Sequence, residues 1–246
     1  MALDKLEKYY AIRSYEGDQN NNLRLVTLMN ILQDAATTDA DRRGFGMDFC
    51  LKNNMTWVGN DHIVEIERLP KVGEEIRVMT WPSLAGKFAA RRDFAVYDEK
   101  NNLIMKSASR WLLINLDKKR PLSIPDVLAG YTAIDEQILE TDFAKIAEPA
   151  DNLTTYRYKV RYDDIDVNHH INNAVYVLWA GEAVDNDWHK SHTPARIAIN
   201  FRKEGFLGED IEVMTAISEN KSLHSVCVKG DNARELARAE IIWKRL

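Results

Sequence analysis

The chain has 246 residues, of which 45% are hydrophobic and 29% are charged, and its formal net charge is −5 at pH 7. This composition is typical of a folded globular protein, and the length allows one large domain or two ordinary ones. The negative net charge argues against a nucleic-acid-binding protein that depends on neutralising phosphates.

The sequence also indicates where the protein works. Its two cysteines, Cys50 and Cys227, are too few for a disulfide framework, and its first residues lack the apolar run of a secretory signal peptide. No window approaches the roughly 18 apolar residues of a membrane span. We therefore expect a cytoplasmic protein without stable membrane association.

The first half is predicted to begin with a short strand and an Asx-rich loop, followed by a helix. Leu25, Leu28, Met29 and Leu32 recur at helical spacing, and Asn22 is placed to cap the helix. Alternating and β-branched runs separated by turn residues predict strands after it. These strands are expected over residues 62–67, 75–81, 88–97 and 103–115.

A proline-interrupted, acid-rich segment follows, and the second half then repeats the order of loop, helix and strands. Its helix has Val175, Leu178, Trp179 and Ala183 on one face, behind the pair 172–173. Strands are predicted over residues 195–203, 210–218, 222–229 and 236–245.

An internal repeat relates the two halves. The run GEEIRVMT at residues 73–80 recurs as GEDIEVMT at residues 208–215. Four earlier residues, Tyr10, Arg13, Asp18 and Asn20, match Tyr158, Arg161, Asp166 and Asn168. A helix followed by antiparallel strands, written twice, predicts a duplicated α+β fold. We place its domains at 1–125 and 156–246, joined by a linker at 126–155.

The most informative segment is the polar stretch before the second helix. A carboxylate, an amide and an imidazole stand at alternate positions, as Asp166, Asn168 and His170. In an extended segment they would share one side. Asn172 and Asn173 then open the helix, whose free amides form an anion site. We expect a functional site here; the structural alternative is a solvated turn that caps the helix.

The chain closely resembles the acyl-acyl carrier protein (acyl-ACP) thioesterases of plant plastids and bacteria. The resemblance covers nearly the whole chain and is strongest in residues 57–125, with GKFAARRD at 86–93 and SRW at 109–111, and in DIDVNHHINN at 164–173. It identifies the chain as similar to a bacterial member of this family. The implied fold is a tandem hotdog, in which two central helices are each wrapped by antiparallel sheet and the sheets join.

The resemblance implies that the protein hydrolyses the thioester of fatty acyl-ACP, releasing free fatty acid and holo-ACP in fatty acid biosynthesis. The family's site residues fall on Asp166, Asn168 and His170, and its Glu-Cys pair falls on Glu204 and Gly205. Because glycine cannot act as a nucleophile, carboxylates, amide and imidazole must carry the chemistry. We hypothesise that Asp166 acts as nucleophile or as base toward water, that Asn168 and His170 orient the carbonyl and water, and that Glu204 activates water.

The first half has asparagine, Asn22, in place of His170, so we predict one active site per chain, in the second half. The resemblance assigns the shaping of the acyl pocket to the first half. Because carrier proteins are acidic, Arg91 and Arg92 are candidate docking residues, together with Lys87 and the basic run 118–120. The predicted substrate-binding residues are Met29, Leu32, Trp57, Arg91, Arg92, Asn172 and Asn173.

Three other functions remain open on sequence grounds. An acyl-CoA thioesterase would cleave the same bond, and a non-catalytic acyl-binding protein would use the polar cluster for structure. A metallohydrolase is disfavoured because the candidate ligands 163–170 crowd on one short segment. We expect no metal or cofactor, and either a monomer or a homodimer.

Overall fold

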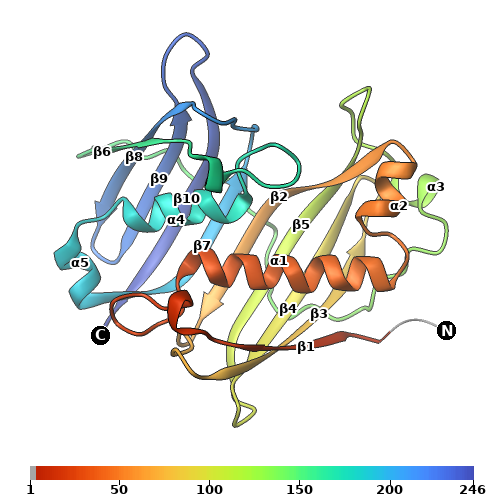
Figure 1. The fold of residues 1–246 in the computed structure, drawn as a ribbon, viewed down its shortest axis with the longest axis horizontal. Coiled ribbons are helices and arrows are strands. Elements are labelled where there is room, and N and C mark those ends of the chain that lie inside the picture. Colours follow the sequence, from red (N-terminus) through yellow and green to blue (C-terminus); the bar gives the residue numbers. More distant parts are fainter. Residues whose placement is uncertain (1–3) are drawn as a thin grey trace. The chain divides into compact units, whose positions relative to one another are not determined.

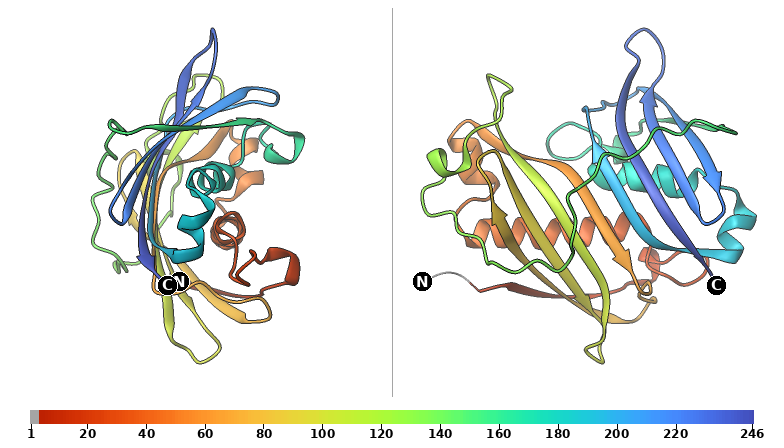
Figure 2. Two further views of the ribbon diagram at one scale, coloured as in Figure 1. Left: turned by 90° about the vertical axis from the view of Figure 1, so that its left-hand side faces the viewer. Right: turned by 180° about the vertical axis from the view of Figure 1, so that it is seen from behind.

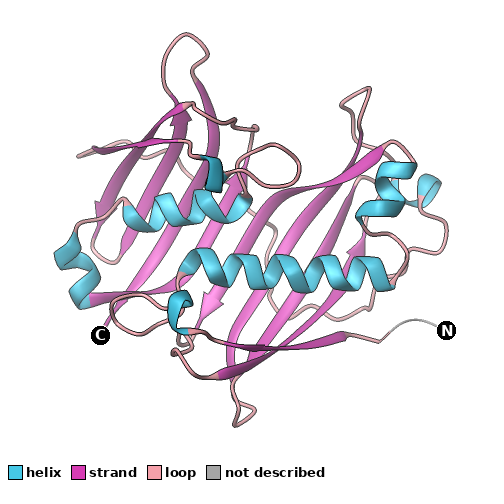
Figure 3. Ribbon diagram, viewed as in Figure 1, coloured by secondary structure: helices cyan, strands magenta, loops and turns pink. Residues whose placement is uncertain are grey.

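The computed structural model describes residues 4–246. The chain divides between Phe143 and Ala144 into two compact units, and this division falls inside the predicted linker. In each unit a helix crosses one face of an antiparallel sheet (Figure 1, Figure 3).

The first unit contains one long helix, two short ones and five strands in the order β1-β3-β4-β5-β2, among the residues described. Each neighbouring pair is antiparallel. Its elements are β1 (Leu6–Ala11), α1 (Leu25–Arg42), α2 (Met47–Lys52), β2 (Met55–Ile66), β3 (Glu75–Ala85), β4 (Ala89–Tyr97), β5 (Leu103–Asn115) and α3 (Ile124–Val127).

The second unit repeats this arrangement, with the strand order β6-β8-β9-β10-β7 and antiparallel pairs. Strand by strand, this is the order of the first unit, as the internal repeat predicts. Its elements are β6 (Thr154–Lys159), α4 (Asn173–Glu182), α5 (Asn186–Ser191), β7 (His192–Phe201), β8 (Asp210–Ser218), β9 (Lys221–Val228) and β10 (Arg234–Arg245).

The cores follow from the two periodicities in the sequence. On β3 the alternate residues Ile76 and Val78 are fully buried, as are Leu28 and Leu32 on α1. On β8 the repeated residues Ile211 and Val213 are buried in the same way. Burying one such aliphatic side chain stabilises the fold by about 1.5–3 kcal/mol.

Most predicted strands lie where expected, and β5 and β8 match at both ends. The main difference is β2, which begins at Met55 rather than at His62. Its early part pairs with the end of the long strand β5, and a bulge between Gly59 and Asp61 resets the register before His62. A bulge interrupts the alternation that identifies a strand in sequence.

A buried carboxylate ties α1 to β4. Asp39 is completely buried and accepts hydrogen bonds from Arg92 Nη1 (2.8 Å), Arg43 Nε (2.8 Å) and Arg42 Nη2 (2.7 Å). Burial acts to raise the pKa of Asp39, but the charge of Arg92 and the hydrogen bonds of all three arginines outweigh it, so the pKa is lowered. Asp39 is therefore an ionised group inside the first unit.

The chain after α3 runs along the face of the first sheet opposite α1 (Figure 2). Ile134 N–H donates to Pro82 O (2.8 Å), and Ile138 N–H donates to the buried carboxylate of Asp93 (3.0 Å). Arg91 pairs with Asp93 (2.8 Å) and donates to the carbonyl of Leu139. This part of the predicted linker is therefore a packed segment of the first unit.

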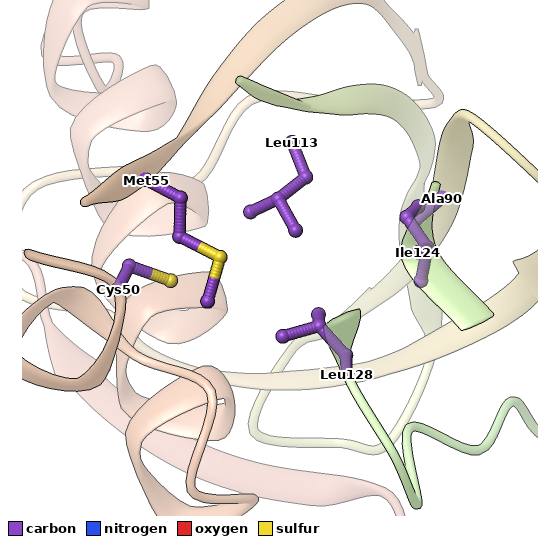
Figure 4. Close-up of a cluster of buried hydrophobic side chains, with 6 residues drawn as sticks. All are labelled: Cys50, Met55, Ala90, Leu113, Ile124 and Leu128. Atoms are coloured by element: carbon purple, nitrogen blue, oxygen red, sulfur yellow. The ribbon is translucent and has the colours of Figure 1, made fainter. Parts of the chain in front are cut away.

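A second apolar cluster lies beside α2 and α3 (Figure 4). Trp57 packs against it and donates from Nε1 to Phe45 O (3.0 Å). Cys50 belongs to the cluster, and burial raises the pKa of its thiol to about 11. The cluster consists of Cys50, Met55, Ala90, Leu113, Ile124 and Leu128.

Candidate active site

The polar segment before α4 is a tight turn. Asp166 N–H donates to His170 O (2.9 Å), His169 N–H donates to Asp166 O (3.0 Å), and the Asp166 carboxylate accepts from Asn168 N–H (2.8 Å). His169 adopts a positive φ of 63°. The predicted extended conformation is therefore wrong, because the Asp166 side chain bonds its own backbone and closes an Asx turn.

The first unit contains the same turn. Asp18 N–H donates to Asn22 O (2.7 Å), and the Asp18 carboxylate accepts from Asn20 N–H (2.8 Å). Asn21, which matches His169, also has a φ of 63°. The duplication is therefore confirmed at the level of single hydrogen bonds. One of the differences between the two turns is the last position, which is Asn22 in the first and His170 in the second.

The start of α4 lies directly behind the turn. Asn172 is its N-cap and accepts from Ala174 N–H (2.9 Å), as predicted. Asn172 N–H itself donates to the carbonyl of Asp164 (2.9 Å), whose buried carboxylate pairs with Arg161 (2.8 Å). In α1 the prediction fails, because the helix begins after Arg24 and Asn22 belongs to the turn. Because Ala174 N–H is bound by the cap and Val175 N–H donates to Asn172 O (2.9 Å), the feature of α4 that suits an anion is the positive end of its dipole.

The loop between β7 and β8 brings a second carboxylate to this place. Ile171 N–H donates to Gly205 O (2.9 Å), which joins the two loops. His170 Nε2 then lies 3.4 Å from Glu204 Oε2. The His170 side chain is 30% exposed and that of Glu204 is 55% exposed, so water reaches both groups. A carboxylate beside an accessible imidazole can hold and activate a water molecule.

Three residues near this pair were not predicted. Tyr176 is buried on α4, its hydroxyl accepts from the Gly205 backbone N–H, and burial raises its pKa well above the usual value. Phe206 makes an edge contact with the His170 ring at 5.2 Å between centroids, and Arg234 contacts Phe206. Tyr176 is four residues after the cap Asn172, a spacing that could have placed it on the same helix face; Phe206 and Arg234 have no comparable local signal.

The structure supports chemistry without a thiol. A Cβ atom at Gly205 would lie 2.4 Å from Ile171 Cδ1 and 2.8 Å from Leu236 Cδ1, so the neighbouring side chains leave no room for any residue larger than glycine unless they shift. Burial also raises the thiol pKa of both Cys50 and Cys227, which keeps them protonated and weakly nucleophilic.

Substituting cysteine at this position tests that conclusion. We expect Gly205→Cys to destabilise the protein by about 1–3 kcal/mol, because Ile171 and Leu236 must repack around the new side chain. We also expect no gain in thioester hydrolysis. Urea unfolding and thiol-release assays measure the two effects. A variant with higher turnover that alkylation abolishes would contradict the expectation.

The remaining predicted binding residues all belong to the first unit. Met29 and Leu32 are buried on α1, and Trp57 lies beside the apolar cluster, so their part in an acyl pocket stays a prediction. Arg91 and Arg92 are only 5% and 7% exposed, and each is held by a buried aspartate. Neither guanidinium is therefore presented to a docking partner. The partner of Arg91 is its neighbour Asp93 on the same strand, whereas that of Arg92 is Asp39 on α1, far away in the sequence.

Two absences apply to residues 4–246. Within that range no group of three or more histidine, cysteine or acidic side chains is arranged to hold a metal ion. Over the same residues, no helix has the length and apolarity needed to cross a membrane.

The fold and this site define a tandem hotdog protein with a polar turn at the start of its second central helix. An acyl-ACP thioesterase from Bacteroides thetaiotaomicron has the same fold, with a TM-score of 0.89 and 23% identity over 98% of each chain. The 12:0-ACP thioesterase from Umbellularia californica gives a TM-score of 0.87 and 26% identity, with 100% of each chain covered. The predicted tandem hotdog fold is thereby confirmed.

The sequence also matches the models of two protein-family domains. The acyl-ACP thioesterase N-terminal domain matches residues 4–131, and the C-terminal domain matches residues 147–245. The chain belongs to the acyl-ACP thioesterase family. A chloroplastic palmitoyl-acyl carrier protein thioesterase from Gossypium hirsutum is 28% identical over 96% of this chain. The chain spans 61–66% of the length of the first three curated relatives.

Proposed function

We propose that this protein hydrolyses the thioester of fatty acyl-ACP to free fatty acid and holo-ACP, as a cytoplasmic enzyme of fatty acid biosynthesis. The observation that carries the proposal is the His170–Glu204 pair beside the Asp166 turn and the start of α4. The relatives support the substrate, because they are named as palmitoyl- and dodecanoyl-acyl carrier protein thioesterases or hydrolases.

The geometry suggests a role for each group. Thioester hydrolysis needs an oxygen nucleophile, donors for the developing oxyanion and a proton for a thiolate that leaves readily. Glu204 activates water, Asn168 and His170 orient the carbonyl and the water, and the positive dipole end of α4 favours the developing negative charge. Asp166 serves as nucleophile or base, with Asn168 Nδ2 3.3 Å from its second carboxylate oxygen.

The carrier protein is the proposed partner, and acidic carriers favour a basic surface. Lys87, Lys118, Lys119 and Arg120 are exposed in the first unit and remain candidates for this contact. Charge reversal at a true docking position weakens carrier binding at low salt and leaves the hydrolysis of a small thioester intact. The proposal is compatible with a monomer or a homodimer.

The test is thiol release from acyl-ACP thioesters of several chain lengths, with acyl-CoA of the same lengths alongside. Wild type and the Cys50→Ala/Cys227→Ala double variant should both turn over, with the higher kcat/KM on the carrier-bound acyl groups. A preference for acyl-CoA would identify an acyl-CoA thioesterase instead. Tight acyl binding without thiol release would identify a binding protein and refute the proposal.

A further inference from the structure

The loop that carries Glu204 is held by one arginine from β10. Arg234 Nη2 donates to the carbonyl of Glu204 (2.9 Å) and to both carboxylate oxygens of Glu209 (2.8 and 3.0 Å). Glu209 also accepts from Phe206 N–H (2.9 Å). The Arg234 and Glu209 side chains are 18% and 21% exposed, so this ion pair is largely shielded from water. The guanidinium thereby fixes both ends of the loop.

The first unit holds its matching loop with a different and more exposed arginine, Arg68, which also pairs with Asp98 (3.0 Å). Arg68 Nη1 donates to Glu74 (2.9 Å) and, at 3.4 Å, to the carbonyl of Leu69. Glu74 and Leu69 are the repeat equivalents of Glu209 and Glu204. Arg68, which follows β2, corresponds to Lys203, so the guanidinium of the second unit comes instead from Arg234 on β10. Each unit therefore has an arginine that bonds both a carbonyl and a glutamate of this loop.

Because its arginine comes from β10, the second unit has a contact between that arginine and an aromatic ring. The Arg234 guanidinium lies 5.7 Å from the centroid of the Phe206 ring, and that ring makes the edge contact with His170. The first unit has Lys71 in place of Phe206, Asn22 in place of His170 and Leu69 in place of Glu204. The arginine is thus connected to both members of the candidate catalytic pair, through the Glu204 carbonyl and through the Phe206 ring.

We propose that Arg234 is a positioning residue that holds Glu204 and Phe206 against His170, so that the imidazole and carboxylate meet at the geometry needed for hydrolysis. The proposal rests on the proposed function of that pair. Arg234 touches neither the ring of His170 nor the carboxylate of Glu204 in these contacts, so it acts through the loop. A shift of about 1 Å in a catalytic group can lower a rate by about 100-fold.

The experiment compares Arg234→Ala with Arg68→Ala, which breaks the equivalent contact in the unit without the imidazole. Both variants should lose stability, measured by urea unfolding, because Arg234→Ala frees a loop and Glu209, and Arg68→Ala frees a loop, Glu74 and Asp98. Arg234→Ala should also lower kcat about 100-fold with KM changed much less, whereas Arg68→Ala should keep the wild-type kcat. Equal kcat for folded Arg234→Ala and wild type would overturn the proposal, as would equal losses in both variants.

Two gentler variants keep the test open if Arg234→Ala does not fold. Arg234→Lys retains a charge near Glu209 but cannot span the carbonyl and the carboxylate, so kcat should fall while the fold persists. Phe206→Leu removes the ring and leaves the ion pair intact, and it should lower kcat in part. Wild-type kcat in both variants would also overturn the proposal.

A spectroscopic readout separates this proposal from the proposed function. The Phe206 ring current acts on the His170 ring protons, so their NMR signals should move in Arg234→Lys and stay in place in Arg68→Ala. If wild type hydrolyses no thioester, the proposed function fails, while these signals still report whether Arg234 positions the pair. Unmoved His170 signals in Arg234→Lys would contradict the positioning role whatever the activity.

Discussion

Replacing Asp166 with asparagine is expected to lower thioester turnover by about 100-fold or more while the protein stays folded. Asparagine keeps a side-chain oxygen that can accept from Asn168 N–H, so the turn should persist. It removes the carboxylate that we propose as nucleophile or base, and losing a general base typically costs 100-fold to 10,000-fold. Thiol release under saturating acyl-ACP measures the effect.

The chain supplies a matched control in Asp18→Asn. Asp18 closes the equivalent turn and also accepts from Asn22 N–H (2.9 Å), so the two substitutions should affect stability to a similar degree. Turnover should remain at the wild-type level in Asp18→Asn. Near-native turnover in folded Asp166→Asn would remove Asp166 from the mechanism and leave it the purely structural role of its counterpart.

Asp39→Asn is expected to have the largest effect on stability, about 3–5 kcal/mol, because it leaves the buried Arg92 and Arg43 without their counter-charge. Urea unfolding at pH 7 measures it. Asp34→Asn is the control on the same helix, because Asp34 pairs with Lys8 at 2.6 Å with side chains 52% and 34% exposed. Such an exposed pair contributes about 0–1 kcal/mol. Equal losses in the two variants would refute the importance of burial.

The lowered pKa of Asp39 also predicts how acid acts on the wild type. A carboxyl that titrates lower in the folded state than the ordinary value of about 3.9 contributes stability above that pH. The contribution is lost as the pH falls through the folded-state pKa. The stability of Asp39→Asn should therefore depend less on pH than that of wild type below about pH 4. Parallel pH–stability curves would contradict this assignment.

Much of the fold could be predicted because its signals are local or repeated. The alternation in β3 and β8, the apolar face of α1 and the repeat of GE(E/D)I(R/E)VMT all reflect burial on one side of an element. The predictions failed where backbone groups bond to side chains. The side chains of Asp18 and Asp166 close turns, where the sequence pattern predicts a helix cap at Asn22 and an extended segment at 166–170. A bulge interrupts the alternation in the first part of β2.

The candidate site divides along the same line. Asp166, Asn168 and His170 could be proposed from one continuous segment, whereas the contact between His170 and Glu204 depends on the hydrogen bond between Ile171 and Gly205. Arg91 and Arg92 show the opposite error. Their charges suggest surface positions, but both side chains are buried. Arg91 pairs with Asp93 on its own strand, and Arg92 pairs with Asp39 on α1. Pairing across elements leaves little trace in a single sequence.

The duplicated turn shows that the loop can form whether or not it carries the imidazole. Because Asp18 and Asp166 close the same turn with the same backbone bonds, the ancestral unit needed no imidazole to form it. A duplicated gene could therefore change the residue now seen as Asn22 or His170 without refolding the segment around it. Either copy could thereby diverge in chemistry while the turn that both share stayed intact.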